Sequence, residues 1–213
     1  VVAWHKHVIG GTFNGGQAVV ESIATLPTDT GEDELFMIVK RTINSVTKRY
    51  IEKMKVFDFG DDATTAFFVD SGLTYSGSAA TVISGLDHLE GQSVSILADG
   101  STHPNKTVSG GSITLERSST KVNIGLGYTS LLQTLRLHET VGAEVGPDVN
   151  NMERIPFRSS AASMDSPVPL FTGDKQIEFS DDFNTDGFVV VRQTQPLPLS
   201  LLSAYPRITI NEG

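Results

Sequence analysis

Oxygen-bearing side chains alternate in one segment near the C-terminal end of the chain. Asp182, Asn184 and Asp186 stand at alternate positions before Gly187, which is the first half of a calcium-binding loop. The twelfth position counted from Asp182 is Gln193, where such a loop needs a bidentate glutamate. A predicted strand also begins directly after the glycine, where that motif has a helix. The pattern favours an Asx-rich turn, with a weakly bound surface cation as the alternative.

Two histidines near the start of the chain are two residues apart. His5 and His7 would share one face of a strand, and two such side chains can bind a metal if a neighbouring strand supplies a third ligand. His88, His103 and His138 are too scattered in the sequence to nominate that ligand. An exposed strand face is the reading that we favour.

Catalytic motifs are incomplete. Asp58-Phe59-Gly60 repeats the magnesium tripeptide of kinases, but no glycine-rich phosphate loop or His-Arg-Asp segment accompanies it. The carboxylates of Asp58, Asp61 and Asp62 are typical of a solvated linker. Ser109-Gly110-Gly111-Ser112 is typical of a hairpin loop and not of a nucleophile elbow. We therefore predict no catalytic residues, no cofactor and no enzymatic activity.

Composition favours many short strands. The 213 residues include 20 Gly and 9 Pro, which favour frequent turns. The absence of cysteine excludes disulfides and thiolate metal sites. A net charge of −9 makes a long nucleic-acid-binding basic patch improbable, and no apolar run is long enough to predict a membrane span. A chain that begins with Val1 and not Met is expected to be a fragment or a processed product.

The first 55 residues predict a four-stranded meander, the unit from which propeller blades are built. Turn clusters and short polar connections separate its strands. The strands are predicted at residues 1–8, 18–26, 34–41 and 45–54. One such unit cannot stand alone, because its faces need neighbours.

The rest of the chain predicts a linker and two further β regions. Residues 56–66 are the linker, and residues 67–126 are a small β-barrel or immunoglobulin-like sandwich. Its strands are predicted at 67–70, 80–84, 93–98, 112–115 and 121–124. The return segment, 127–213, contains predicted strands at 188–193 and 207–210 and a short helix at 131–138. The predicted class is all-β.

Several stretches spread over almost the whole chain resemble the tail tubular or tail nozzle proteins of podovirus-like phages, as the C-terminal part of a longer protein. The most specific are Phe68-Val69-Asp70-Ser71-Gly72-Leu73-Thr74-Tyr75 and Ile83-Ser84-Gly85-Leu86-Asp87-His88-Leu89-Glu90-Gly91-Gln92. Val2-Ala3-Trp4-His5-Lys6-His7, Ile155-Pro156-Phe157-Arg158 and Gln195-Pro196-Leu197-Pro198-Leu199 fit the same pattern. The family pattern has a further stretch after Leu135, where this chain runs directly into Leu137-His138-Glu139-Thr140.

The resemblance implies a structural virion protein located in the phage tail. It implies a propeller-like fold with an inserted β-domain and a ring of copies, expected to be a hexamer, that contacts other tail or adaptor proteins. DNA would pass transiently through this ring without specific binding. An acidic subunit suits that passage, because it repels phosphates within a Debye length of about 8 Å.

Extended proline segments are the expected contacts between copies, because their fixed φ lowers the entropy cost of ordering. We expect them at residues 164–171, with Pro167, Pro169 and Leu170, and at residues 195–199, with Pro196 and Pro198. Two alternatives stay open. One is a carbohydrate-binding adhesin that uses residues 67–126, and the other is a depolymerase or lytic enzyme with a buried carboxylate pair.

Overall fold

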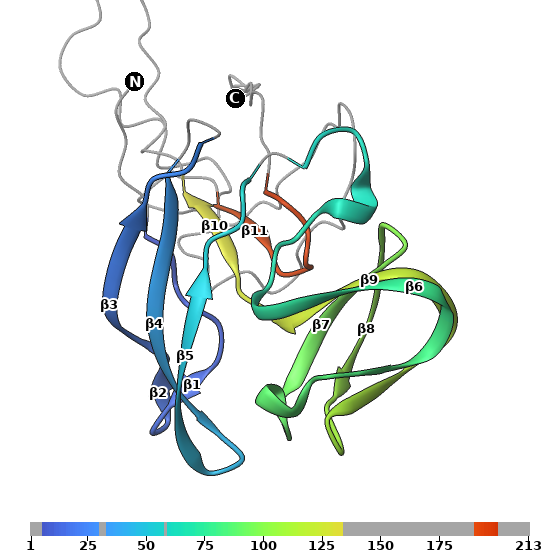
Figure 1. The fold of residues 1–213 in the computed structure, drawn as a ribbon, viewed down its shortest axis with the longest axis horizontal. Coiled ribbons are helices and arrows are strands. Elements are labelled where there is room, and N and C mark those ends of the chain that lie inside the picture. The colour runs from blue at the N-terminus through green and yellow to red at the C-terminus, as the bar shows by residue number, and fades with distance from the viewer. Residues whose placement is uncertain (1–5, 30–32, 58, 134–189, 200–213) are drawn as a thin grey trace, which may run out of the picture. The chain divides into compact units, whose positions relative to one another are not determined.

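The computed structural model describes residues 6–29, 33–57, 59–133 and 190–199. Strands dominate this part of the chain, two single-turn 3-10 helices are its helical elements, and its sheets are antiparallel (Figure 1). The predicted all-β class is therefore confirmed. None of the sheets formed by these residues closes into a barrel, and none of their helices is long and apolar enough to span a membrane.

The N-terminal region forms a small hairpin and a three-stranded sheet. The hairpin pairs β1 (Thr12–Phe13) with β2 (Gly16–Gln17). The sheet has the order β3-β4-β5, with β3 at Val19–Leu26, β4 at Glu34–Ile43 and β5 at Val46–Lys53. The three longer strands confirm the predictions at 18–26, 34–41 and 45–54, with β4 two residues longer. Residues 6–8 are not in a strand, so the prediction for 1–8 is wrong there, and residues 1–5 lie outside the described part.

A tight turn joins β4 to β5. Asn44 and Ser45 both have positive φ, at 48° and 61°, which is the backbone of a two-residue type I′ turn. This turn suits the right-handed twist of the flanking strands and sets their register, with Ile43 opposite Val46. The register determines which side chains of the sheet share a face.

The second region is a four-stranded antiparallel sheet. Its order is β6-β9-β7-β8, with β6 at Asp70–Ser84, β9 at Ser112–Leu126, β7 at Ser93–Ala98 and β8 at Ser101–Thr107. The 3-10 turns Ala63–Thr65 and Asp87–Leu89 precede and follow β6. Pro104 is tolerated in β8 because this strand is at the edge of the sheet.

Three predictions for this region are wrong. Residues 67–69 are not in a strand, and Ser76-Gly77-Ser78, which the sequence predicts as a turn between the strands at 67–70 and 80–84, lie inside β6. Register shifts between Ser76 and Ala80 absorb this Gly/Ser-rich stretch without ending the strand. The strands predicted at 112–115 and 121–124 are likewise one continuous strand, β9, because β6 pairs along nearly its whole length.

The hydrophobic core belongs to this second sheet. β7 is buried along Val94–Ala98, and Ile96 is paired with Ile124 of β9, both fully buried. The cluster is completed by side chains from the strands and the connecting turns, namely Ile83, Leu86, Leu89, Val94, Ala98, Val108, Ile113, Leu115, Val122 and Leu126. Burying each large side chain contributes about 1.5–3 kcal/mol, so this core is the main stabilising element of the described chain.

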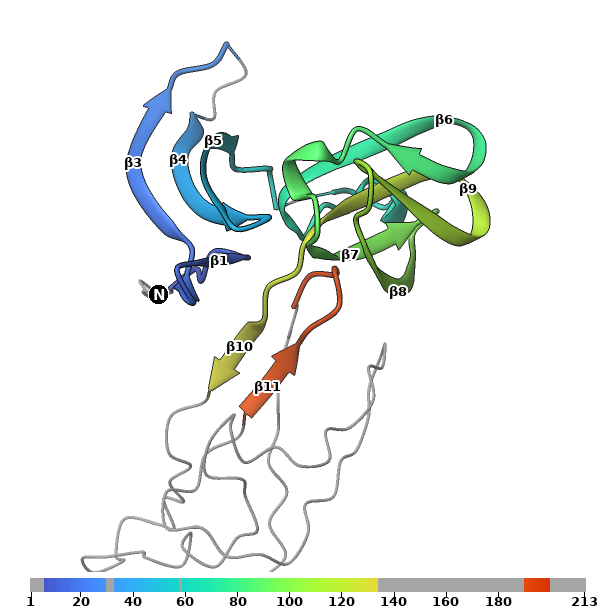
Figure 2. The same cartoon turned by 90° about the horizontal axis from the view of Figure 1, so that it is seen from below.

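A last antiparallel pair joins β10 (Ser130–Gln133) to β11 (Val190–Gln193). By its contacts this pair belongs to a compact unit separate from the one that contains β1 to β9 (Figure 2). The helix predicted at 131–138 is wrong over Leu131–Gln133, which form β10, because pairing with β11 satisfies their backbone hydrogen bonds. The remainder of that prediction lies outside the described residues.

Candidate functional site

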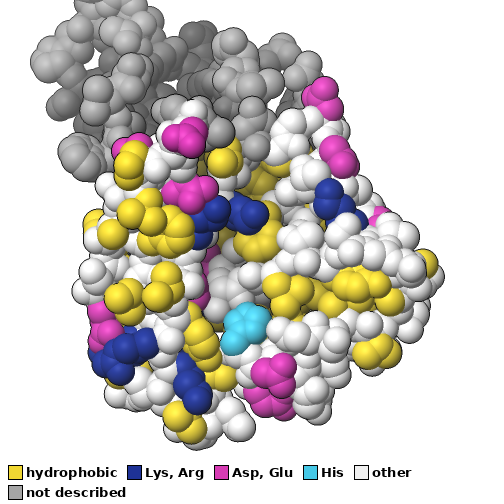
Figure 3. Space-filling view, viewed as in Figure 1, with side chains coloured by type: hydrophobic (Ala, Val, Ile, Leu, Met, Phe, Trp, Pro, Cys, Tyr) yellow, Lys and Arg dark blue, Asp and Glu magenta, His cyan; other side chains and the backbone are white. Residues whose placement is uncertain are grey.

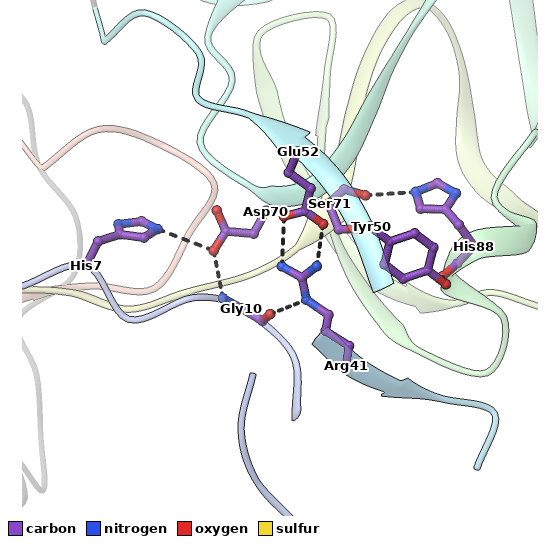
Figure 4. A network of polar contacts seen from close by, with 8 residues as sticks. All are labelled: His7, Gly10, Arg41, Tyr50, Glu52, Asp70, Ser71 and His88. Atoms are coloured by element: carbon purple, nitrogen blue, oxygen red, sulfur yellow. Dashed lines mark hydrogen bonds and ion pairs between the residues drawn. The ribbon is translucent and has the colours of Figure 1, made fainter. Parts of the chain in front are cut away.

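A chain of polar contacts joins the three-stranded sheet, the segment before β1 and the four-stranded sheet (Figure 4). We call it the junction network and define it as His7, Gly10, Arg41, Glu52 and Asp70. The residues come from four places in the sequence, namely the segment before β1, β4, β5 and β6, so only the folded chain brings them together.

A buried ion pair lies at one end of the junction network. The side chain of Arg41 in β4 is completely inaccessible to solvent, and its guanidinium binds the carboxylate of Glu52 in β5 through two parallel hydrogen bonds. The Nη2–Oε2 distance is 3.0 Å. This bidentate geometry is the strong form of an Arg–carboxylate contact, and it offsets the cost of removing both charges from water.

The peptide group of Gly10 is held from both sides. Arg41 Nε donates to the Gly10 carbonyl oxygen at 2.8 Å, and the Gly10 amide donates to Asp70 Oδ2 at 2.7 Å. There is little space around it, because a Cβ on Gly10 would lie 3.1 Å from both Gly127 O and Leu126 Cβ. The segment before β1 is thus fixed between β4 and the start of β6.

His7 lies at the other end of the junction network. Its Nε2 is 3.4 Å from Asp70 Oδ2, and its ring meets the Tyr128 ring edge-on at a centroid distance of 4.9 Å. The hydrogen bond to Asp70 raises the pKa of His7 above its ordinary 6.5, burial opposes this shift, and the Asp70 charge adds to it. Burial also raises the pKa of Tyr128.

A second contact joins the two sheets through Tyr50 and His88. Tyr50 Oη donates to the His88 carbonyl at 3.1 Å, and His88 Nε2 donates to the Ser71 carbonyl at 2.8 Å. Burial raises the pKa of Tyr50, and the Arg41 charge opposes this shift. The junction network and this contact together hold the two sheets to each other through hydrogen bonds and an ion pair. Their role in the described chain is structural.

The residues predicted as candidate sites fall mostly outside the described chain. Those are the calcium candidates Asp182, Asn184 and Asp186, together with the interface candidates Pro167, Pro169 and Leu170, and also His5 and Asp58. Pro196 is buried and Pro198 half-buried in the described segment 194–199. Among the described residues, no group of three His, Cys, Asp or Glu side chains is placed to hold a metal, and His7 instead contacts Asp70.

The linker and hairpin motifs have structural roles where they are described. Asp62 caps the 3-10 turn Ala63–Thr65, and hydrogen bonds from Thr64 lower the pKa of its carboxyl. Phe59 packs edge-on against Phe68 at a centroid distance of 5.9 Å. Ser109 and Ser112 exchange backbone hydrogen bonds across Gly110-Gly111, so the predicted hairpin loop is confirmed.

A hollow of about 420 Å³ lies beside β8. Thr102, His103, Pro104, Asn105 and Gln195 line it. His103 Nδ1 donates to the Pro104 carbonyl at 2.8 Å, while its Nε2 accepts the Glu116 amide at 2.9 Å. Both ring nitrogens are occupied by backbone partners, so this histidine is not poised as a general base.

The three-stranded sheet has one face that carries exposed isoleucines. Cross-strand pairing places Ile38 and Ile51 side by side on it, with Phe36 and Leu26 nearby. We call these four residues the isoleucine face. Ile51 is 77% exposed, and Leu26 is also exposed. Val39, Arg41 and Ile43 alternate with them along β4 and are buried on the opposite face.

Ion pairs flank the isoleucine face. Glu21 binds Arg49 and Lys40, each at 2.7 Å, and these hydrogen bonds lower its pKa to about 2. Lys53 and Glu34 form a second pair at 2.8 Å. Figure 3 shows hydrophobic side chains beside basic and acidic ones over β3 to β5. An apolar centre with a charged rim is the usual composition of a protein interface.

No known protein-family model matches this chain, and no curated protein matches it.

Proposed function

We propose that the chain is a non-enzymatic structural subunit of a short-tailed phage virion, forming part of the tail tube or nozzle ring through which DNA is ejected. In this proposal the β3-β4-β5 sheet is one blade of a propeller-like region, and the four-stranded sheet is the inserted domain. The proposed partners are further copies in a hexameric ring and other tail or adaptor proteins. The observation that carries the proposal is the isoleucine face together with the edge of β3 that no described strand pairs with.

The edge of β3 supports assembly. β3 pairs only with β4 among the described strands, and all eight of its residues are exposed. Its sequence, VVESIATL, contains neither the lysine nor the proline that commonly blocks edge pairing. A bulge between Val20 and Ser22 interrupts its pairing with β4 near one end, and the pairing is regular from Ser22 to Leu26. A neighbouring chain would satisfy this edge and cover the isoleucines beside it.

The charge of the chain supports a conduit for DNA. A net charge of −9 repeated around a ring repels phosphates at short range. A basic wall would instead bind DNA with an affinity that rises steeply with each contact. The resemblance to tail tubular and nozzle proteins, carried by residues across the chain, supports the same function.

Ile51→Asp is expected to weaken self-association by about 100-fold or more, because a charge would enter the apolar centre of the contact. Sedimentation equilibrium of the full chain measures this dissociation constant. Val82→Asp is the matched control, since Val82 is 57% exposed on the other sheet. At concentrations at which all three proteins are monomeric, both variants should keep the melting temperature of the wild type, because both side chains are exposed in the single chain.

Two outcomes would count against this use of the isoleucine face. One is equal weakening of association by Ile51→Asp and Val82→Asp. The other is a wild-type chain that stays monomeric at the concentrations found in an assembling tail.

A further inference from the structure

The segment before β1 is attached to the two sheets at two chemically different points. At Gly10 the carbonyl oxygen binds Arg41 of β4, and the amide binds Asp70 of β6. Three residues earlier, the ring of His7 binds the same carboxylate oxygen of Asp70. The first point uses backbone atoms that do not titrate, whereas the second depends on an imidazole that titrates near neutral pH.

We propose that His7 and Asp70 form a proton-controlled latch, which holds residues 7–9 tightly against the four-stranded sheet when the imidazole is protonated and holds them more weakly when it is neutral. The side chains suit this role, because His7 is 33% and Asp70 16% exposed. Protons therefore reach the imidazole from solvent, while the carboxylate is shielded enough for the contact to matter.

The groups around His7 show which charge affects its protonation. Asp70 of β6 faces the Nε2 atom, and Tyr128 after β9 packs against the ring edge-on. Burial and the Asp70 charge raise the pKa of the Tyr128 phenol, so Tyr128 is neutral near pH 7. Arg41 and Glu52, from β4 and β5, bind each other at the far side of Gly10. The carboxylate of Asp70 is thus the charge that His7 senses.

The direction of the pH effect follows from the raised pKa of His7. The folded chain binds this proton more tightly than the unfolded chain, whose histidine titrates near 6.5. The stabilisation by the ion pair is therefore fully present below pH 6.5 and is lost as the pH rises through the higher pKa of the folded state. Neutral imidazole still donates from Nε2 in one of its two tautomers, which weakens the contact without abolishing it.

Opening of the latch would stay local. Gly11 has a φ of +87°, and a Cβ at that position would lie 2.8 Å from Leu126 Cδ1 and 2.9 Å from Arg41 Cδ. The backbone here is fixed by close packing and by the Arg41 contact to the Gly10 carbonyl. Release of His7 therefore frees the chain before Gly10 and leaves β1 in place.

Backbone ¹⁵N relaxation of the full chain tests the latch, because it reports the order of residues 7–9 directly. The heteronuclear NOE of these residues should fall between pH 5.5 and pH 8.0, while that of Gly10, whose amide binds Asp70, should not change. His7→Gln should give the lower values at both pH values. His88→Gln is the control, because His88 binds the Ser71 carbonyl and no carboxylate, and it should keep the wild-type pH dependence.

An NMR titration of the His7 ring in wild type and in Asp70→Asn gives a second measurement that does not depend on local opening. The pKa of His7 should lie above 6.5 in the wild type and should fall in Asp70→Asn. The latch is disproved if the heteronuclear NOE of residues 7–9 does not change with pH, if His7→Gln keeps the pH dependence, or if the His7 pKa is unaffected by Asp70→Asn.

Discussion

Glu52→Gln is expected to lower the free energy of unfolding by about 3–5 kcal/mol. The substitution keeps the shape of the side chain but removes the charge that pairs with Arg41, whose side chain has no access to solvent. An uncompensated buried guanidinium cannot recover its hydration, and this loss is the main cost of breaking a buried pair. Urea denaturation monitored by circular dichroism measures the change.

The chain offers a matched control and a rescue for this experiment. Glu34→Gln breaks the pair with Lys53, in which both side chains are 40% exposed, and should cost less than about 1 kcal/mol. Arg41→Met combined with Glu52→Leu removes both charges together and should recover most of the lost stability. Equal effects of Glu52→Gln and Glu34→Gln would contradict the role given to the junction network.

Ile124→Ala is expected to destabilise the chain by about 2–5 kcal/mol. Ile124 is completely buried opposite Ile96 in the centre of the four-stranded sheet, so truncation removes apolar contacts and leaves a cavity. The same substitution at Ile51 serves as the control, because that side chain is 77% exposed and its truncation should change stability by less than about 0.5 kcal/mol.

Thermal unfolding followed by calorimetry gives both values. If Ile51→Ala destabilised an isolated monomer as much as Ile124→Ala does, the isoleucine face would be packed within the chain. It would then not be available to a neighbouring copy.

The sequence predicts the β4-β5 hairpin well, because its information is local. The nearly continuous apolar run of β4, the alternation in β5 and the polar pair Asn44-Ser45 indicate two strands joined by a tight turn. β6 and β9 are harder, since Gly77 and its serine neighbours have turn chemistry. Each of these long strands is held by the other, and pairing across about 40 residues of chain overrides the local preference.

The junction network could not be predicted from local patterns. Gly10 and Asp70 are separated by 60 positions in the sequence, and Arg41 and Glu52 by 11. Nothing near Arg41 distinguishes it from an exposed end of a strand. The spacing of His7 from His5 suggests a metal ligand, but the partner of His7 is the carboxylate of Asp70 at the start of β6. Such a site is formed by contacts between residues that are far apart in the chain, and a single sequence does not reveal these contacts.

The isoleucine face could not be predicted from the sequence either. The nearly continuous apolar run of β4 and the alternation in β5 indicate strands, but they do not show which face of the sheet is covered. The structure places Val39 and Arg41 on the buried face and leaves Ile38 and Ile51 exposed. The proline segments are the contacts between copies that the sequence predicts, whereas the described sheet carries an exposed apolar face that the sequence does not reveal.

Cryo-electron microscopy of the intact tail tests the central proposal most directly, by locating this polypeptide in the virion. The proposal predicts density for the chain in a symmetric ring around the tail channel, with the isoleucine face and the edge of β3 against a neighbouring copy. Density confined to a peripheral fibre or spike would contradict it and would instead favour a carbohydrate-binding adhesin.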